Sequence, residues 1–200
     1  MSYAKNKIIY MDEVVPNEPY MAETGRSTGL NYGYLFDRFL QKDYFDADGK
    51  LKVDANGEQI LPKMSLGTPR PGDTLFKDLN GDGVIDGDDK TYFGYARHPE
   101  YVFGFLGGFS WKNFEFSMQW TAAMNASRIL EGEYRNAFGS TNSRMLLKFL
   151  ADGRWTEENP CSRFPRLTFM NKTHYLEDTD LWLMNGSYLR LKTAEISYTF

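Results

Sequence analysis

The segment from residue 101 to residue 121 constrains the fold most, because bulky apolar residues occupy every second position along most of it. In 101–111, aromatic residues hold most odd positions and small residues hold most even ones. After Lys112-Asn113 the alternation continues with Phe114, Phe116, Met118 and Trp120, separated by Glu115, Ser117, Gln119 and Thr121. A period of two is typical of a β-strand with one apolar face. The pattern therefore predicts a hairpin with a two-residue turn and one aromatic-rich face.

The length of this hairpin is compatible with two settings. Eleven residues at about 3.3 Å each, tilted by about 40°, span roughly 27 Å, close to the apolar band of an outer-membrane barrel. Trp111 and Trp120 lie near opposite ends of the hairpin, where interfacial girdles occur, and the polar face could line a wet lumen. A hairpin of a soluble β-sandwich, with its apolar face in a core, fits the alternation equally well.

The composition argues against several classes of protein. A net charge of −4 and the lack of a basic stripe argue against nucleic-acid binding. Cys161 is the single cysteine, which excludes an internal disulfide framework, and two histidines are too few for a histidine-rich metal site. No run approaches the roughly 18 apolar residues of a transmembrane helix. Because no nucleophile–base pair or catalytic carboxylate pair is visible, we expect no enzyme activity.

Two long segments flank the hairpin, 10–100 before it and 122–187 after it, and both are expected to be loop-like with little regular structure. The local patterns that stand out are a strand end at 4–10, a strand or helical turn at 32–40, tight turns at 46–50 and Asn56-Gly57, and a helix at 143–150. Residues 1–5 are not part of a signal peptide, so we expect either a soluble chain or a natural start upstream.

The end of the chain, 188–200, returns to alternation but changes its parity. Leu189 and Leu191 share one face, and the apolar positions then move to Ala194, Ile196, Tyr198 and Phe200. Either a bulge near Lys192-Thr193 or a strand whose upper part leaves the membrane would explain the change. Short turns on one side and long loops on the other are typical of outer-membrane barrels. We therefore expect an all-β fold, a partial transmembrane β-barrel of about four strands with two long extracellular loops.

An aspartate-rich stretch inside the first long segment fits the twelve-residue calcium loop. The expected ligands are the side chains of Asp78, Asn80, Asp82, Asp86 and Asp89 and the carbonyl of Val84, with Gly83 at the sharp turn. No flanking helix is expected, and an aspartate closes the loop in place of the usual glutamate. This pattern predicts a structural Ca²⁺ of weak affinity, with Kd on the order of 10⁻⁴ to 10⁻³ M. The alternative is a solvated turn without a cation.

Four stretches of the chain follow one another in a specific order. They are Pro71-Gly72-Asp73 with Phe76–Asp86, then Arg154–Pro160, Arg163–Leu167 and Asn185–Lys192, the last of which leads into Ile196–Thr199. Together they resemble the signature of the SusC/RagA family of TonB-linked outer-membrane proteins, and the hairpin at 101–121 lies where that family places one.

The resemblance implies a fragment, covering residues 1–200, of a TonB-dependent transporter that imports glycans or peptides across the outer membrane of Bacteroidetes. Such barrels have about 22 strands and a plugged lumen. Their expected partners are membrane lipid, a SusD-like lipoprotein cap, and TonB, which acts through an N-terminal part absent from these residues. The fragment should not transport alone. The alternative is a soluble, secreted, calcium-stabilised β-rich carbohydrate-binding module.

Overall fold

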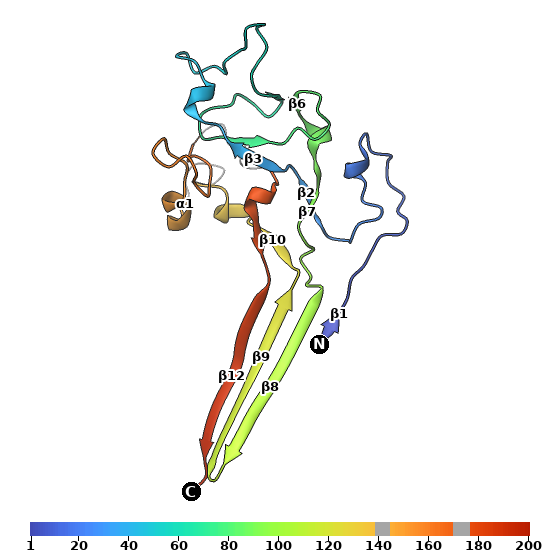
Figure 1. Cartoon of the computed structure of the whole chain (residues 1–200), viewed down its shortest axis with the longest axis vertical. Coiled ribbons are helices and arrows are strands. Elements are labelled where there is room, and N and C mark those ends of the chain that lie inside the picture. The colour runs from blue at the N-terminus through green and yellow to red at the C-terminus, as the bar shows by residue number, and fades with distance from the viewer. Residues whose placement is uncertain (139–144, 170–176) are drawn as a thin grey trace.

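The computed structural model describes residues 1–138, 145–169 and 177–200. Figure 1 shows a tall, narrow β-sheet and, at one end of it, a head built from the long segments between the strands. The hairpin turn and the C-terminus lie at the other end of the sheet. No helix in the described ranges has the length and apolar character needed to cross a membrane.

The tall sheet contains four strands in the order β1-β8-β9-β12, and all its neighbouring pairs are antiparallel. The strands are β1 (Ser2–Tyr3), β8 (Tyr101–Trp111), β9 (Phe114–Met124) and β12 (Tyr188–Tyr198). The predicted hairpin and its turn are confirmed, with Lys112 in the left-handed region at φ 52°. The strand end expected at 4–10 is wrong, because β1 covers only residues 2 and 3. Within the described residues the sheet does not close on itself.

A β-bulge in β12 accounts for the change of parity near the C-terminus. The register shifts between Leu191 and Thr193, so the residue between them is extra. Leu191 lies opposite Trp120, and Ile196, beyond the bulge, lies opposite Phe116. The bulge therefore keeps the apolar residues of β12 on the same face as those of β9, which confirms one of the two explanations drawn from the sequence.

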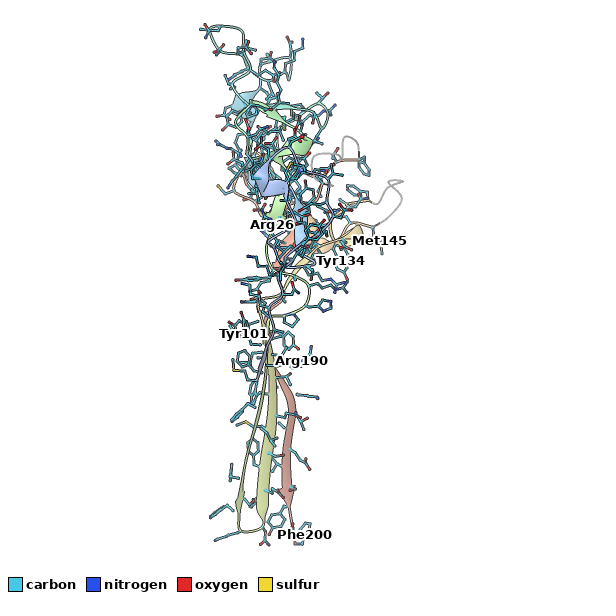
Figure 2. All side chains as sticks on the ribbon, turned by 90° about the vertical axis from the view of Figure 1, so that its right-hand side faces the viewer. Arg26, Tyr101, Tyr134, Met145, Arg190 and Phe200 are labelled. Carbon is cyan, nitrogen blue, oxygen red and sulfur yellow. The ribbon has the colours of Figure 1, made fainter. Side chains whose placement is uncertain are left out.

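Cross-strand pairing sorts the side chains of the three long strands onto two faces. The apolar face carries Tyr101, Phe103, Phe105, Phe109, Trp111, Phe114, Phe116, Met118, Trp120, Leu189, Leu191, Ala194, Ile196 and Tyr198. The opposite, more polar face includes Leu106, Ser110, Glu115, Ser117, Gln119, Thr121, Arg190, Thr193, Glu195 and Ser197. Figure 2 shows Tyr101 on one side of the sheet and Arg190 on the other.

The head is assembled from pairs of short strands. Three pairs are antiparallel: β2 (Asn31–Gly33) with β7 (Thr91–Phe93), β3 (Phe36–Phe39) with β5 (Thr74–Phe76), and β10 (Ser127–Ile129) with β11 (Leu183–Asn185). The fourth pair, β4 (Lys63–Met64) with β6 (Val84–Ile85), is parallel.

Short helices complete the head. The 3-10 helices are η1 (Pro19–Met21), η2 (Lys42–Tyr44), η3 (Gly87–Asp89), η4 (Gly132–Tyr134) and η5 (Asp180–Trp182), and the one described α-helix is α1 (Lys148–Asp152). The helix expected at 143–150 thus overlaps α1 at its end, while 143 and 144 fall outside the described residues. The expected turns are confirmed by hydrogen bonds from Gly49 N to Asp46 O and from Gly57 N to Asp54 O, each 3.1 Å.

In the described parts of 10–100 and 122–187 regular structure is limited to short strands and helical turns, as expected, but two hydrophobic clusters pack these segments together. One cluster joins both segments and buries Phe39, Phe93, Ile129, Leu150, Trp155, Phe164, Leu181 and Trp182. The other is formed within the first segment by Tyr34, Leu40, Phe45, Leu75, Phe76 and Ile85. Strands of two to four residues are too short to show a period in the sequence, and distant partners stabilise them.

Candidate functional site

The apolar face of the long strands is open rather than covered by other described parts of the chain. Phe105, Phe109 and Ile196 are 58%, 63% and 74% exposed, and every residue of β12 is exposed. Burial of such side chains stabilises by about 1.5 to 3 kcal/mol each, so leaving a whole face in water would be costly. The described residues thus supply no core for this face, in contrast to the sandwich alternative.

Aromatic rings on this face contact one another across strand boundaries. The ring centroids of Phe109 and Phe116 are 5.6 Å apart, and those of Phe114 and Tyr198 are 4.8 Å apart. At the head end, Tyr3 of β1 stacks on Tyr101 of β8 at 4.5 Å. Such pairs add to the pairing energy of neighbouring strands. All four strands therefore contribute aromatic side chains to this face.

The aspartate-rich loop connects β5 to β7, and its turns are pinned by its own side chains. Both oxygens of Asp78 accept backbone N–H bonds, from Gly81 at 2.6 Å and from Gly83 at 2.8 Å. An oxygen of Asp82 accepts from Val84 N at 2.7 Å. These bonds fix the backbone turns of the loop.

The closing aspartate of the loop, Asp89, is fully buried and has a second structural role. Its two oxygens accept from Leu79 N at 2.7 Å and from Asp86 N at 3.0 Å. An oxygen of Asp86 in turn accepts from Asp88 N at 2.9 Å, at the N-terminus of η3. The carboxylate of Asp89 therefore joins the beginning of the loop to its end.

The predicted ligands lie in one compact loop, but the structure does not gather their carboxylates around one centre. In the described part of the chain, no three acidic, histidine or cysteine side chains lie close enough together to hold a metal ion. Asn80 donates from Nδ2 to Asp82 at 3.1 Å, so these two contact each other. Calcium binding at Asp78, Asn80, Asp82, Val84, Asp86 and Asp89 stays a prediction.

The N-terminal segment contacts the last turn of this loop. Asn17 donates to both carboxylate oxygens of Asp88, at 2.9 and 3.1 Å, and the hydroxyl of Tyr20 donates to the Asp88 carbonyl at 2.7 Å. Burial, reinforced by Glu18 and the loop carboxylates, raises the pKa of Tyr20 to about 12, so its hydroxyl keeps its proton at neutral pH. The sequence contained no local sign of this contact.

A second junction joins two of the stretches singled out in the sequence. Arg166 donates from Nε to the fully buried carboxylate of Asp73 at 2.7 Å and from its backbone N to Gly72 O at 3.0 Å. Gly72 has a φ of +82° and lies against the ring of Trp155. Arg166 Nη2 is buried without a hydrogen-bond partner among the described residues. These side chains hold the head together.

Comparison with known sequences gives relatives of one kind. No protein-family model matches the chain. The chain is 32% identical over 127 residues to TonB-dependent receptor P26 of Formosa agariphila, covering 64% of this chain and 12% of that receptor. It is 26% identical over 174 residues to TonB-dependent receptor P3 of the same organism, covering 87% and 15%. The chain therefore spans a small part of the relatives it matches.

Comparison with solved structures finds matches of similar fold. The RagAB peptide importer matches in its open-open state with a TM-score of 0.57 and 18% identity, over 98% of this chain and 19% of that one. Its closed-closed state gives a TM-score of 0.53 and 20% identity, over 93% and 18%. At such identities the match shows a shared, mostly β fold. The relatives are receptors and importers rather than enzymes, in agreement with the expectation of no enzyme activity.

Proposed function

We propose that this chain, a homologue of Bacteroidetes SusC-like TonB-dependent receptors, is the part of such a receptor that supplies three membrane-spanning strands and most of two extracellular loops. TonB-dependent receptors reside in the outer membrane of Gram-negative bacteria, and the protein is located there. The observation that carries the proposal is the exposed apolar face that β8, β9 and β12 share across 11 residues each.

The lengths of the connections between strands indicate how the chain is oriented in the outer membrane. The two-residue turn between β8 and β9 lies at one end of the sheet, and the long segments gather in the head at the other end (Figure 1). Outer-membrane barrels have short turns on the periplasmic side and long loops outside the cell. We therefore place the head, built from 10–100 and 122–187, outside the cell and the hairpin turn at the periplasm.

The more polar face of the strands suits a lumen. It carries Glu115 and Ser117 on β9 opposite Ser197 and Glu195 on β12. Alternation of apolar and polar residues is what strands between lipid and a wet interior require. The remaining strands would come from other parts of the receptor, since the chain covers about one eighth to one fifth of its curated relatives.

The partners follow from this assignment. We propose that the complete receptor imports glycans or peptides, that TonB powers it through a part outside these residues, and that a SusD-like lipoprotein caps it. The two-component RagAB peptide importer supports such a cap. The soluble carbohydrate-binding module remains the alternative, but the open apolar face disfavours it because a soluble module would bury that face.

The membrane assignment predicts opposite tolerance at two neighbouring positions of β8. Phe105 on the apolar face is 58% exposed and Leu106 on the polar face is 75% exposed. In a receptor containing this chain, Phe105→Arg should destabilise the barrel by about 2 to 4 kcal/mol, because it places a charge in lipid near mid-strand, whereas Leu106→Arg should cost little. The measurement is the amount of heat-modifiable receptor in the outer-membrane fraction.

Leu106→Arg is the matched control, because it adds the same side chain to the same strand. If Phe105→Arg and Leu106→Arg accumulated equally in the outer membrane, the lipid assignment would be wrong. A protein recovered as a detergent-free soluble monomer would favour the binding-module alternative instead.

For the aspartate-rich loop we propose weak Ca²⁺ binding by Asp78, Asn80, Asp82, Asp86, Asp89 and the carbonyl of Val84. The order of oxygen-bearing residues along the loop supports it, as does the turn geometry that Asp78 and Asp82 fix through their hydrogen bonds to the backbone. The ion would neutralise charges that otherwise repel one another, and would tie the loop ends together.

This proposal predicts a calcium-dependent stability. If Kd is about 10⁻³ M, 10 mM Ca²⁺ should stabilise the chelator-treated protein by about 1.4 kcal/mol, seen as a raised unfolding temperature. Asp78→Asn should abolish the response, while Asp54→Asn, in a similar turn outside the loop, should keep it. An unfolding temperature of the unsubstituted protein that ignores Ca²⁺ would contradict the proposal.

A further inference from the structure

An open groove lies on the apolar face of the long strands, next to the hairpin turn that forms the lower end of the sheet in Figure 1. It has a volume of about 440 Å³, which is within the range of small-ligand sites. Strands β8, β9 and β12 all contribute to its walls, and the lining residues are Phe109, Trp111, Phe114, Glu115, Phe116 and Ile196. Apart from Glu115, all of these side chains are apolar.

Contacts between the strands hold the groove in this shape. The rings of Phe109 and Phe116, on neighbouring strands, are 5.6 Å apart. Beyond the end of β12, the backbone N of Thr199 donates to Asn113 O in the hairpin turn at 2.9 Å. The third strand is therefore tied to the turn of the other two, and the groove has a fixed end there.

The hairpin from 101 to 121 contains only two charged residues, Lys112 and Glu115. Neighbouring side chains of a strand point to opposite faces, so Glu115 points away from the rings on either side of it. It also lines a small cavity on the opposite, polar face, together with Ser117, Glu195 and Ser197. The carboxylate of Glu115 thus belongs to the polar face, and Lys112 is the charged residue of the hairpin that can serve the groove.

The ammonium of Lys112 lies against one wall of the groove. Its Nζ is 5.0 Å from the centroid of the Trp111 ring, a distance typical of a cation–π contact. Trp111 is 62% exposed and lines the groove. Lys112 forms no ion pair with any described residue, so its N–H donors are available to a ligand. The groove therefore combines apolar walls with a single positive charge at the end next to the turn.

We propose that this groove binds one anionic phospholipid of the periplasmic leaflet. An acyl chain lies against Phe109, Phe116 and Ile196, and the ammonium of Lys112 binds the phosphate, for which lysine is a common partner. A phospholipid has the same arrangement, with a long apolar chain and a negative phosphate at one end of it. The position of the turn at the periplasm is taken from the proposed function, on which this inference rests.

The headgroup is expected to carry a net negative charge. A zwitterionic headgroup brings its own cation close to the phosphate, and that cation would repel the ammonium of Lys112. One basic side chain near an anionic surface contributes enough for about a fivefold preference. We therefore expect phosphatidylglycerol to be bound about fivefold more tightly than phosphatidylcholine.

The test uses a receptor containing this chain, reconstituted in vesicles of phosphatidylcholine and phosphatidylglycerol in which one lipid carries brominated acyl chains. Bromine quenches tryptophan fluorescence on contact, and the part of the emission that Trp111→Phe removes reports on the groove. This part should be quenched with about a fivefold preference for brominated phosphatidylglycerol. Lys112→Gln should reduce the preference to about one, whereas Lys112→Arg keeps the charge and should retain it.

Two controls are built into the chain. Lys50→Gln removes the same charge from an exposed turn of the head and should leave the preference unaltered. Trp120 lies on the same apolar face but nearer the head, opposite Leu191, and the emission that Trp120→Phe removes should show no preference between the two lipids. Excess glycerol phosphate, which has the phosphate without the chain, should not compete.

The outcomes separate this inference from the proposed function. Quenching of Trp111 by both lipids equally, a preference that survives Lys112→Gln, or loss of the preference in glycerol phosphate would overturn the phospholipid site alone. If neither brominated lipid quenched Trp111, the assignment of this face to the membrane would be wrong, and the proposed function would fail with it.

Discussion

Replacing Gly72 with alanine is expected to destabilise the head by about 2 to 4 kcal/mol, because it combines backbone strain with overpacking. Gly72 has a φ of +82°, where residues with a Cβ are strained. A Cβ at this position would also overlap the ring of Trp155 and lie 2.8 Å from Cβ of Arg166. The measurement is thermal unfolding followed by tryptophan fluorescence, to which Trp155 contributes.

Gly49 separates the two contributions to this loss. Its φ is +76°, but nothing lies within 4 Å of the position that a Cβ would take. Gly49→Ala therefore introduces strain without overlap and should cost about 1 kcal/mol. If Gly72→Ala were no more destabilising than Gly49→Ala, the close packing of Trp155 and Arg166 on Gly72 would be unimportant.

Replacing Asp73 with alanine is expected to cost about 3 to 5 kcal/mol, since it leaves a largely buried guanidinium without its counter-charge. The carboxylate of Asp73 is fully buried, accepts from Arg166 Nε at 2.7 Å and also accepts from Arg70 N at 2.9 Å. Arg166 Nη2 already lacks a hydrogen-bond partner among the described residues, so removing Asp73 would also take away the carboxylate that Nε contacts. Chemical denaturation of the purified protein measures the effect.

Two further variants test whether charge is the cause. Asp152 forms an exposed ion pair with Lys148 at 2.7 Å, and Asp152→Ala should cost no more than about 0.5 kcal/mol. In the Asp73→Ala background, Arg166→Met should recover part of the lost stability, because it removes the unpaired charge and keeps the volume. A double variant less stable than Asp73→Ala would assign the loss to packing instead.

Local pattern was sufficient to predict the three long strands and their turn. Alternation over 11 residues is a strong signal, because each side chain of a strand faces away from its neighbours in the chain. The same argument located the irregularity near Lys192 and Thr193. It could not decide between a bulge and a strand leaving the sheet, because that choice depends on which residues of β9 lie opposite.

The tight turns of the head followed from local pattern, but the pairing of its strands could not be predicted from it, for a physical reason. Its strands are two to four residues long and are stabilised by partners far along the chain, as when Phe36 of β3 pairs with Phe76 of β5. The family resemblance singled out the stretches around Gly72 and Arg166, but it predicted no contact between them. Only the fold shows that they meet.

Motif order and alternation thus established which family the chain resembles and which residues form its apolar face, since both are properties of neighbouring positions. Tertiary structure decided which residues far apart in the sequence contact one another. The bond between Arg166 and Asp73 joins residues 93 positions apart, and Arg128 lies opposite Met184 because two distant segments pair as strands. Such contacts depend on burial and on chain closure over long separations, which no local spacing encodes.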